Sequence, residues 1–390
     1  MMKMRKLPAA ILAAAAGLVA TTGAAQAETS VTLYGIVDLG IGYQKIRGQG
    51  TDVSRTGMID GQQSGSRWGL RGSEDLGNGT RAIFQLESGF NSRTGRSRQG
   101  DRLFGRQATI GLANDAWGQV TAGRQVNISS LFFSSIDPMG ASYHQASLGS
   151  VFSSTETLRW DNLIQYLSPS IGGFQAGVGY SFDTGEAGNV GDLAGDNTFA
   201  TNNKNRAITG GLRYANGPLN VAATADYLNP ASNNGADGSK GPIRIFSWQV
   251  GGTYDFEVVK LALAYGQIED GWFGSAGVQS GQGFGGPGSN YFNGTDGTDR
   301  SVNGFKAKSY MVGLSAPVGP GSLFGSWQRA DPSNDRLTGD DKTMNIYSLG
   351  YTYDLSKRTN LYAYGSYAKN WAFLDGYKST AAGVGVRHRF

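Results

Sequence analysis

The 390-residue chain has no cysteine, 10 prolines and two histidines, His144 and His388. Without cysteine there is no disulfide framework, no thiolate metal ligand and no thiol nucleophile. Two histidines far apart in the sequence do not readily assemble a catalytic triad or a histidine-rich metal centre. We therefore expect no metal ion, no cofactor and no enzymatic activity.

Long apolar runs are missing after residue 27, so no later segment is long enough for a transmembrane helix. The chain begins with basic residues, continues as a nearly uncharged run from Leu7 to Ala20, and then places Ala25 and Ala27 where signal peptidase reads small side chains. This pattern is typical of a secretory signal peptide, and the run is too short and too rich in alanine for a stable membrane anchor. We expect a signal peptide over residues 1–27 and one domain over residues 28–390.

A strong charge of either sign is also missing. The chain has 34 basic and 30 acidic residues, and three of the basic ones belong to the signal peptide, which leaves 31 against 30, a net charge of +1. Bulk charge therefore gives no support to nucleic-acid binding, and we expect no nucleic acid among the partners.

Glycine, aromatic residues and alternation are abundant instead: the chain has 61 Gly, 18 Tyr and 18 Phe. Apolar residues alternate with more polar ones from Val31 to Tyr43, again from Leu219 to Tyr227, and again from Val259 to Tyr265. A period of two residues predicts strands with one apolar and one wetter face. A soluble sandwich would alternate in the same way, so alternation alone does not decide the fold.

The length and spacing of these strands distinguish a membrane barrel from a soluble sandwich. We count about sixteen segments of roughly nine to thirteen residues, the length that a tilted membrane-spanning strand needs. Short and long connections alternate along the chain. The short ones lie near residues 75–80, 114–117, 168–173, 215–218, 255–257, 317–320 and 355–359, and the long ones near 44–65, 91–103, 126–155, 183–204, 229–243, 268–304, 330–342 and 370–378.

Long loops at one end and short turns at the other predict an all-β fold, a 16-stranded antiparallel transmembrane β-barrel with both termini in the periplasm. Lipid cannot satisfy an open sheet edge, so such a barrel must close. Aromatic residues at several strand ends, among them Tyr43, Tyr214, Trp248 and Trp371, are expected at the membrane interfaces. The chain ends in an alternating segment with a terminal Phe390, which resembles the signal that the barrel assembly machinery reads.

Several motifs carry a family resemblance. The segment Ser66–Glu87 resembles the second and third strands of the Gram-negative general porins, particularly those of β-proteobacteria. The resemblance continues through residues 106–112, 118–125, 159–162, 166–169, 355–359 and 388–390, and so covers nearly all of the mature chain. It implies a homotrimer in the outer membrane, a third loop folded into the lumen, and contacts with lipid and lipopolysaccharide.

The resemblance also implies an arginine ladder along the constriction wall, formed by Arg67, Arg124 and Arg159. Alternation supports part of this assignment, because a charged side chain facing lipid costs about 2–4 kcal/mol at the midplane. Trp68 and Leu70 on the lipid side turn Arg67 and Arg71 inward. Arg159 is opposite in parity to Trp160, Ile164 and Tyr166, so we expect it to point inward too. Arg124 breaks the alternation, which indicates either a β-bulge at Gly123 or a bend where the third loop begins.

Acidic groups are expected opposite this ladder. Asp137 lies in the third-loop segment that corresponds to the acidic turn of the family, while Met139 stands where the family often has Glu. Asp137 could equally cap the turn before Pro138. Glu87, opposite in parity to Phe84 and Leu86, adds one more inward acid.

Three or four arginines against one or two acids predict a water-filled channel for small hydrophilic solutes that prefers anions. An outer-membrane enzyme would need a Ser and His pair on the barrel wall, and an adhesin would need no wide polar lumen. The second long loop carries five further arginines that either face anionic lipopolysaccharide or latch onto a neighbouring subunit: Arg93, Arg96, Arg98, Arg102 and Arg106.

Overall fold

A computed structural model describes residues 30–155, 159–184, 205–229, 244–273 and 300–390, so the expected signal peptide lies outside the described residues. Among the described residues no helix is long and apolar enough to cross a membrane. The strands are β1 (Ser30–Gly48), β2 (Thr51–Asp60), β3 (Arg67–Gly77), β4 (Thr80–Gly89), β5 (Gln107–Asn114), β6 (Gly118–Val126), β7 (Arg159–Leu167), β8 (Phe174–Ser181), β9 (Arg206–Asn216), β10 (Leu219–Asn229), β11 (Ile245–Asp255), β12 (Lys260–Trp272), β13 (Arg300–Val318), β14 (Gly321–Pro332), β15 (Met344–Asp354), β16 (Thr359–Lys369) and β17 (Lys378–Arg389). The helical segments are α2 (Ile128–Phe133), η1 (His144–Ala146), η2 (Leu148–Ser150), η3 (Ser153–Thr155) and η5 (Trp371–Phe373).

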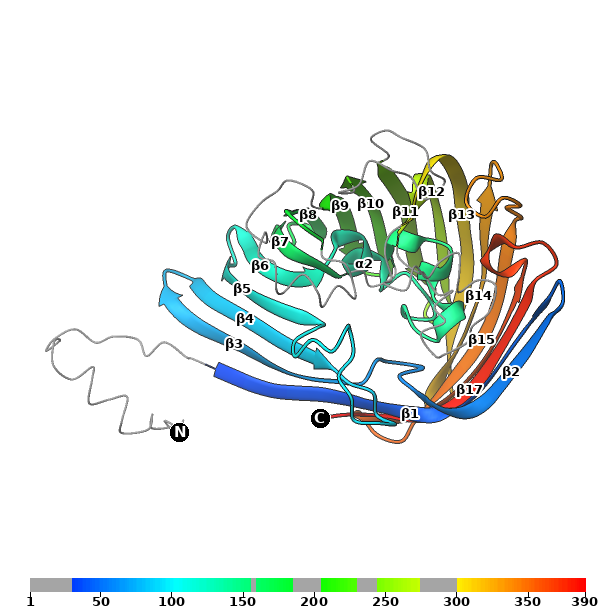
Figure 1. Cartoon of the computed structure of the whole chain (residues 1–390). Helices are drawn as coiled ribbons and strands as arrows, with labels where there is room; N and C mark the ends of the chain where they lie inside the picture. The colour runs from blue at the N-terminus through cyan, green and yellow to red at the C-terminus, as the bar shows by residue number, and fades with distance from the viewer. Residues whose placement is uncertain (1–29, 156–158, 185–204, 230–243, 274–299) are drawn as a thin grey trace, which may run out of the picture.

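The strands form one closed antiparallel barrel (Figure 1). One edge of β1 pairs first with β3, over Ser30–Ile36, and then with β2, over Leu39–Gly48. Because β2 and β3 share this edge, they are two halves of a single barrel strand, and the seventeen strand segments occupy sixteen positions. The other edge of β1 pairs with β17, which closes the barrel. The predicted 16-stranded fold is confirmed.

The first long loop is shorter than expected, and the prediction of a loop over residues 44–65 was wrong. β1 runs on to Gly48, and β2 returns along it from Thr51. The two residues between them, Gln49 and Gly50, have φ values of 40° and 84°. Positive φ at both central residues is the requirement of a type I′ hairpin turn, which matches the twist of the flanking strands. The backbone N–H and C=O groups of this segment, which a solvated loop would expose to water, therefore pair with each other between β1 and β2.

The short connections lie where the sequence predicts them. β3 ends at Gly77 and β4 begins at Thr80, and between them Asn78 and Gly79 have φ values of 53° and 72°. Asn-Gly is the dipeptide that a two-residue hairpin of this type favours. The other six short connections also join consecutive strands of the barrel, so all seven leave from the same end.

The two faces of the wall follow the predicted alternation. On β10, Ala222, Thr224 and Asp226 are at most 5% exposed and face inward, while outward positions elsewhere carry exposed Ile, Leu and Val. Tyr265 stacks with Trp248 and with Tyr310 at ring-centroid distances of 5.6 and 5.2 Å. Trp371 does not belong to such a girdle: it is 3% exposed within η5, so that part of the prediction was wrong.

The long connection between β6 and β7, hereafter the third loop, folds into the barrel and is tied to the inner wall. At its start, Ile128 N–H donates to Thr209 Oγ1 of β9 (2.9 Å), and Ser129 and Asn127 both donate to the Asp226 carboxylate of β10. Further along, Gln328 of β14 donates to the carbonyl of Ala146 (2.7 Å). The predicted infolded loop is confirmed.

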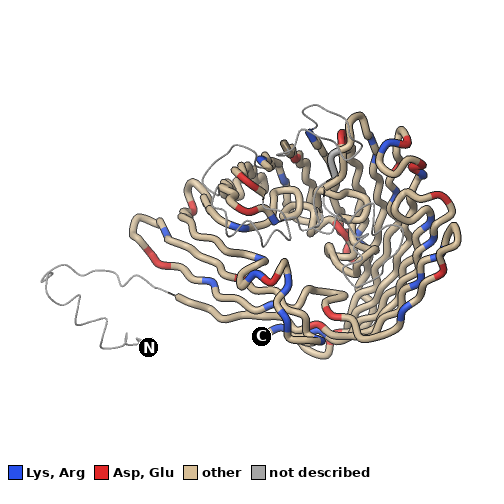
Figure 2. The backbone as a smooth tube through the Cα atoms, in the orientation of Figure 1, with Lys and Arg blue, Asp and Glu red and all other residues tan. Residues whose placement is uncertain are grey.

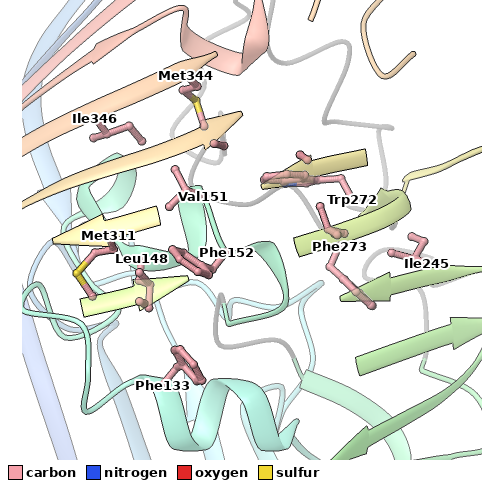
Figure 3. Packing of buried hydrophobic residues seen from close by; sticks show 14 of the residues in the cluster. Phe133, Leu148, Val151, Phe152, Ile245, Trp272, Phe273, Met311, Met344 and Ile346 are labelled. Atoms are coloured by element: carbon pink, nitrogen blue, oxygen red, sulfur yellow. The ribbon is translucent and has the colours of Figure 1, made fainter. Parts of the chain in front are cut away.

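Apolar side chains fix this loop against one side of the lumen. Phe133, Leu148 and Phe152 of the third loop pack in one cluster with Met311 of β13 and Ile346 of β15 (Figure 3). Burying each large apolar side chain contributes about 1.5–3 kcal/mol, so the cluster holds the loop firmly. The third loop lies against the inner faces of β8 to β17, where Ser379 of β17 donates to Gln145 (2.6 Å). The wall of β1 and β3 to β7 faces the remaining space.

Candidate functional site

The wall opposite the third loop begins with Tyr34, Arg67 and Glu87 on one inward face. In the registers of β1, β3 and β4, Gly69 lies opposite both Tyr34 and Glu87, which places these positions on the same face. Tyr34 Oη donates to Glu87 Oε2 (3.0 Å), and Arg67 is close enough to Glu87 and Tyr34 to interact electrostatically. Alternation had predicted Arg67 and Glu87 inward, and both lie there.

Arg106 and Arg159 extend this wall. Arg106 Nε donates to Glu87 Oε1 at 2.6 Å, and both side chains are largely buried. Arg159 Nε donates to the carbonyl of Arg106 (3.0 Å), so the second loop and the start of β7 meet at the same place. We call this group of side chains the arginine cluster. Its members are Arg67, Arg102, Arg106, Arg124 and Arg159 with the carboxylates of Glu87 and Asp161.

Arg124 joins through a shared carboxylate. Its guanidinium donates to Asp161 Oδ1 (2.6 Å) and to the carbonyl of Gly105 (2.7 Å), and Arg102 donates to both oxygens of Asp161. The ladder between β6 and β7 shifts register between Gly123 and Gln125, so the expected β-bulge is present. A side chain at Gly123 would be impossible, because a Cβ there would lie 2.0 Å from a backbone oxygen and the φ is 123°.

The parity argument used for Arg159 was wrong at one of its three reference residues, although Ile164 is 46% exposed, as expected of an outward position. Trp160 does not face lipid: it is 3% exposed and lies against Phe273, with ring centroids 6.5 Å apart. Asn162 has a φ of 50°, so alternation is not continuous through the start of β7. The direction of Arg159 follows from its contact with Arg106 instead.

Arg71 lies on the same inward face, nearer the short turns. Its guanidinium carbon sits 5.4 Å from the centre of the Tyr34 ring, which is a cation–π distance. It lines a lumen cavity with residues of β1 and β3 to β7, so the structure places it inward, as alternation predicts.

Asp137 makes the contacts of a turn-capping residue. Its carboxylate accepts backbone N–H groups of Met139, Ala141 and Leu148, each at 2.9 Å, and the residue is 6% exposed. Burial raises the pKa of this carboxyl to about 6. Met139, at the position expected for a family acid, is buried in a second apolar cluster that also contains Tyr143.

Sequence reasoning did not single out Asp161, and it assigned Arg102 and Arg106 only to a surface loop. The second loop instead folds back: Arg98 pairs with Asp60, Arg102 with Asp161, and Arg106 with Glu87, while Arg93 and Arg96 are exposed. Figure 2 shows basic segments with a few acidic ones around this loop, in front of β3 to β6. One feature of the sequence could have indicated this role of Asp161. It lies two residues after Arg159 at the start of β7, and so has the same parity as that arginine.

The C-terminus completes the wall at the closing seam. Phe390 and Gly35 exchange two backbone hydrogen bonds of 3.1 Å, and the Phe390 ring covers the space where a Gly35 side chain would lie. The terminal aromatic thus packs on the first strand.

A closed barrel with a loop folded into its lumen and a charged wall facing that loop defines a channel protein of the outer membrane. The chain belongs to the Gram-negative porin family, whose model matches residues 13–371. It is 57% identical to an outer membrane porin protein of Bordetella pertussis, over 97% of this chain and 99% of the relative. It is 31% identical to outer membrane porin protein 32 of Delftia acidovorans, over 96% and 98%.

Solved structures agree with this family assignment. The anion-selective porin from Comamonas acidovorans superposes with a TM-score of 0.67 and 26% identity, covering 93% of this chain and all of that one. OmpF of Salmonella typhi, at 18% identity and a TM-score of 0.62, shares the fold. The chain is therefore an outer-membrane porin that crosses the membrane with its strands.

Proposed function

We propose that this porin is a trimeric diffusion channel that prefers anions, with its constriction between the third loop and the arginine cluster. The observation that carries the proposal is the charge of that wall. Five guanidinium groups meet two carboxylates there: Arg67, Arg102, Arg106, Arg124 and Arg159 against Glu87 and Asp161. Arg71 adds a further positive charge to the same inward face, nearer the short turns.

The facing loop does not balance this charge. Asp137 is its acid nearest the predicted position, and its carboxylate is enclosed by three backbone N–H groups. In a narrow aqueous lumen such an imbalance favours entry of anions and orients dipolar solutes. The relative from Comamonas acidovorans, described as anion-selective, supports the same direction. Small anionic or polar solutes are thus the expected cargo, and we infer a channel rather than an enzyme.

Single-channel recording in planar bilayers tests the channel and its assembly together. The protein should insert as a large ohmic conductance that rises or closes in three equal steps, because each subunit of a trimer holds its own lumen. One step for each insertion would contradict the trimer, and no conductance would contradict the channel.

Replacing one arginine tests the constriction. Arg106→Gln should lower the anion-to-cation permeability ratio by a factor of up to about five, since one charge at about 4 Å in water is worth about 1 kcal/mol. Arg213→Gln is the matched control, because Arg213 faces the lumen from β9, where its Nε donates to Asn220 at 2.8 Å, outside the arginine cluster. An equal change in both variants would contradict the proposed constriction.

A further inference from the structure

A second feature of the lumen lies between the arginine cluster and the short turns. A half-open cavity of about 410 Å³ is lined by β1, β3 to β7 and Leu131 of α2. Its position follows from the strand direction: β3 runs from Arg67 in the cluster past Arg71 to the turn after Gly77. A solute that has passed the arginine cluster therefore meets this cavity next.

The lining of this cavity differs in chemistry from the arginine cluster. It carries five glutamines, three threonines and a single charged side chain, Arg71. Amide and hydroxyl groups both donate and accept hydrogen bonds. The glutamines come from four neighbouring strands and so form a continuous polar wall: Gln85, Gln107, Gln119, Gln125 and Gln165.

Arg71 has no acidic partner within pairing distance in the described part of the chain. Its guanidinium lies over the Tyr34 ring, and the Tyr34 hydroxyl is occupied by Gln85 Nε2 (2.6 Å) and by Glu87. Stacking on a ring leaves the N–H fork of an arginine able to donate, and a carboxylate is the group whose geometry matches that fork. The charged end of a ligand would bind here.

Gln165 gives an independent indication of a ligand. It is 4% exposed, lines the cavity, and its Oε1 accepts no hydrogen bond from any residue that the structure describes. A buried acceptor without a donor is unfavourable, and rotation of the amide would present it to a hydroxyl group in the cavity. Its neighbour Gln125, in contrast, is held by Thr121 and by the carbonyl of Leu163.

We propose that this cavity is a binding site for small hydroxylated carboxylates of the sugar-acid class. The carboxylate binds Arg71, and the hydroxyl groups bind the glutamine wall. An inorganic anion would use only Arg71, a neutral sugar only the wall, and a fatty acid would leave the amides unpaired. This proposal rests on the channel function proposed above, because the ligand reaches the site only through the lumen.

Block of the channel current by gluconate tests the site. Gluconate added to purified wild-type channels in chloride should reduce the open-channel current at concentrations where acetate and sorbitol do not. Arg71→Gln should weaken this block by about tenfold or more, as expected for a lost hydrogen bond to a charged group. Gln165→Leu should weaken the gluconate block without changing conductance in chloride alone. Arg213→Gln is the control and should leave the block unchanged.

The outcomes separate this proposal from the channel function. Wild-type protein without conductance would overturn the proposed function itself. Conducting channels in which acetate blocks as well as gluconate, or in which Arg71→Gln keeps the wild-type gluconate block, would overturn the sugar-acid site alone. A wild-type circular dichroism spectrum of each variant in detergent shows that it is folded.

Discussion

At the scale of residues, the two acids of the arginine cluster hold guanidinium groups in place without neutralising the wall. Glu87 accepts hydrogen bonds from Arg106 and Tyr34, and Asp161 accepts from Arg102 and Arg124. Each carboxylate therefore fixes arginines that would otherwise repel one another. The same two carboxylates therefore stabilise the wall and, by their negative charge, reduce its preference for anions.

Glu87→Gln should raise the anion-to-cation permeability ratio, by up to about fivefold, because one negative charge leaves the wall. The same change should lower the free energy of unfolding by about 1–3 kcal/mol, since Arg106 loses a charge-assisted hydrogen bond. Reversal potentials and thermal unfolding in detergent measure the two effects. Asp255→Asn is the control, because Asp255 pairs with Lys260 beside a short turn. A lowered ratio in Glu87→Gln would contradict this role of the acid.

At the scale of elements, the third loop is held by buried polar contacts as well as by its apolar cluster. Two of its titratable groups, His144 and Asp137, change the stability of the protein in opposite directions as the pH falls. Burial, with Arg98 and Arg55 nearby, lowers the pKa of His144 to about 4, while burial raises the pKa of Asp137 to about 6. A lowered histidine pKa contributes stability above about pH 6.5 that is lost as the pH falls toward 4. A raised aspartate pKa acts in the opposite direction between about pH 6 and 4.

His144→Gln should therefore become more stable relative to the wild type as the pH falls from about 6.5 to 4, by up to about 3 kcal/mol. Asp137→Asn should become less stable relative to the wild type over the same interval. Thermal unfolding in detergent, followed by circular dichroism at several pH values, measures both. Wild-type pH profiles in both variants would show that these groups do not govern the loop.

At the scale of the whole molecule, the barrel closes where the last residue meets the first strand. Phe390→Ala keeps the two backbone hydrogen bonds to Gly35 but removes the ring that covers it. If the ring is the assembly signal, this variant should refold in detergent like the wild type yet accumulate far less in the outer membrane of cells. Phe390→Tyr is the conservative control. Normal accumulation of Phe390→Ala would contradict the signal.

Most of this architecture follows from the sequence, because membrane-spanning strands obey simple rules of alternation and length. Alternation placed Arg67, Arg71 and Glu87 on the inner face, where the structure has them. It wrongly placed Trp160, the neighbour of Arg159, on the lipid side, because the bulge after Gly123 and the positive φ of Asn162 interrupt the period of two. Arg102 and Arg106 could not be assigned, since a loop has no periodicity and its path depends on tertiary pairing with Asp161 and Glu87.

The central claim, that the arginine cluster makes this porin prefer anions, is tested most directly by the zero-current potential of the wild-type channel across a potassium chloride gradient. The account predicts a potential with the sign set by chloride moving down its gradient. A potential with the sign set by potassium would contradict it.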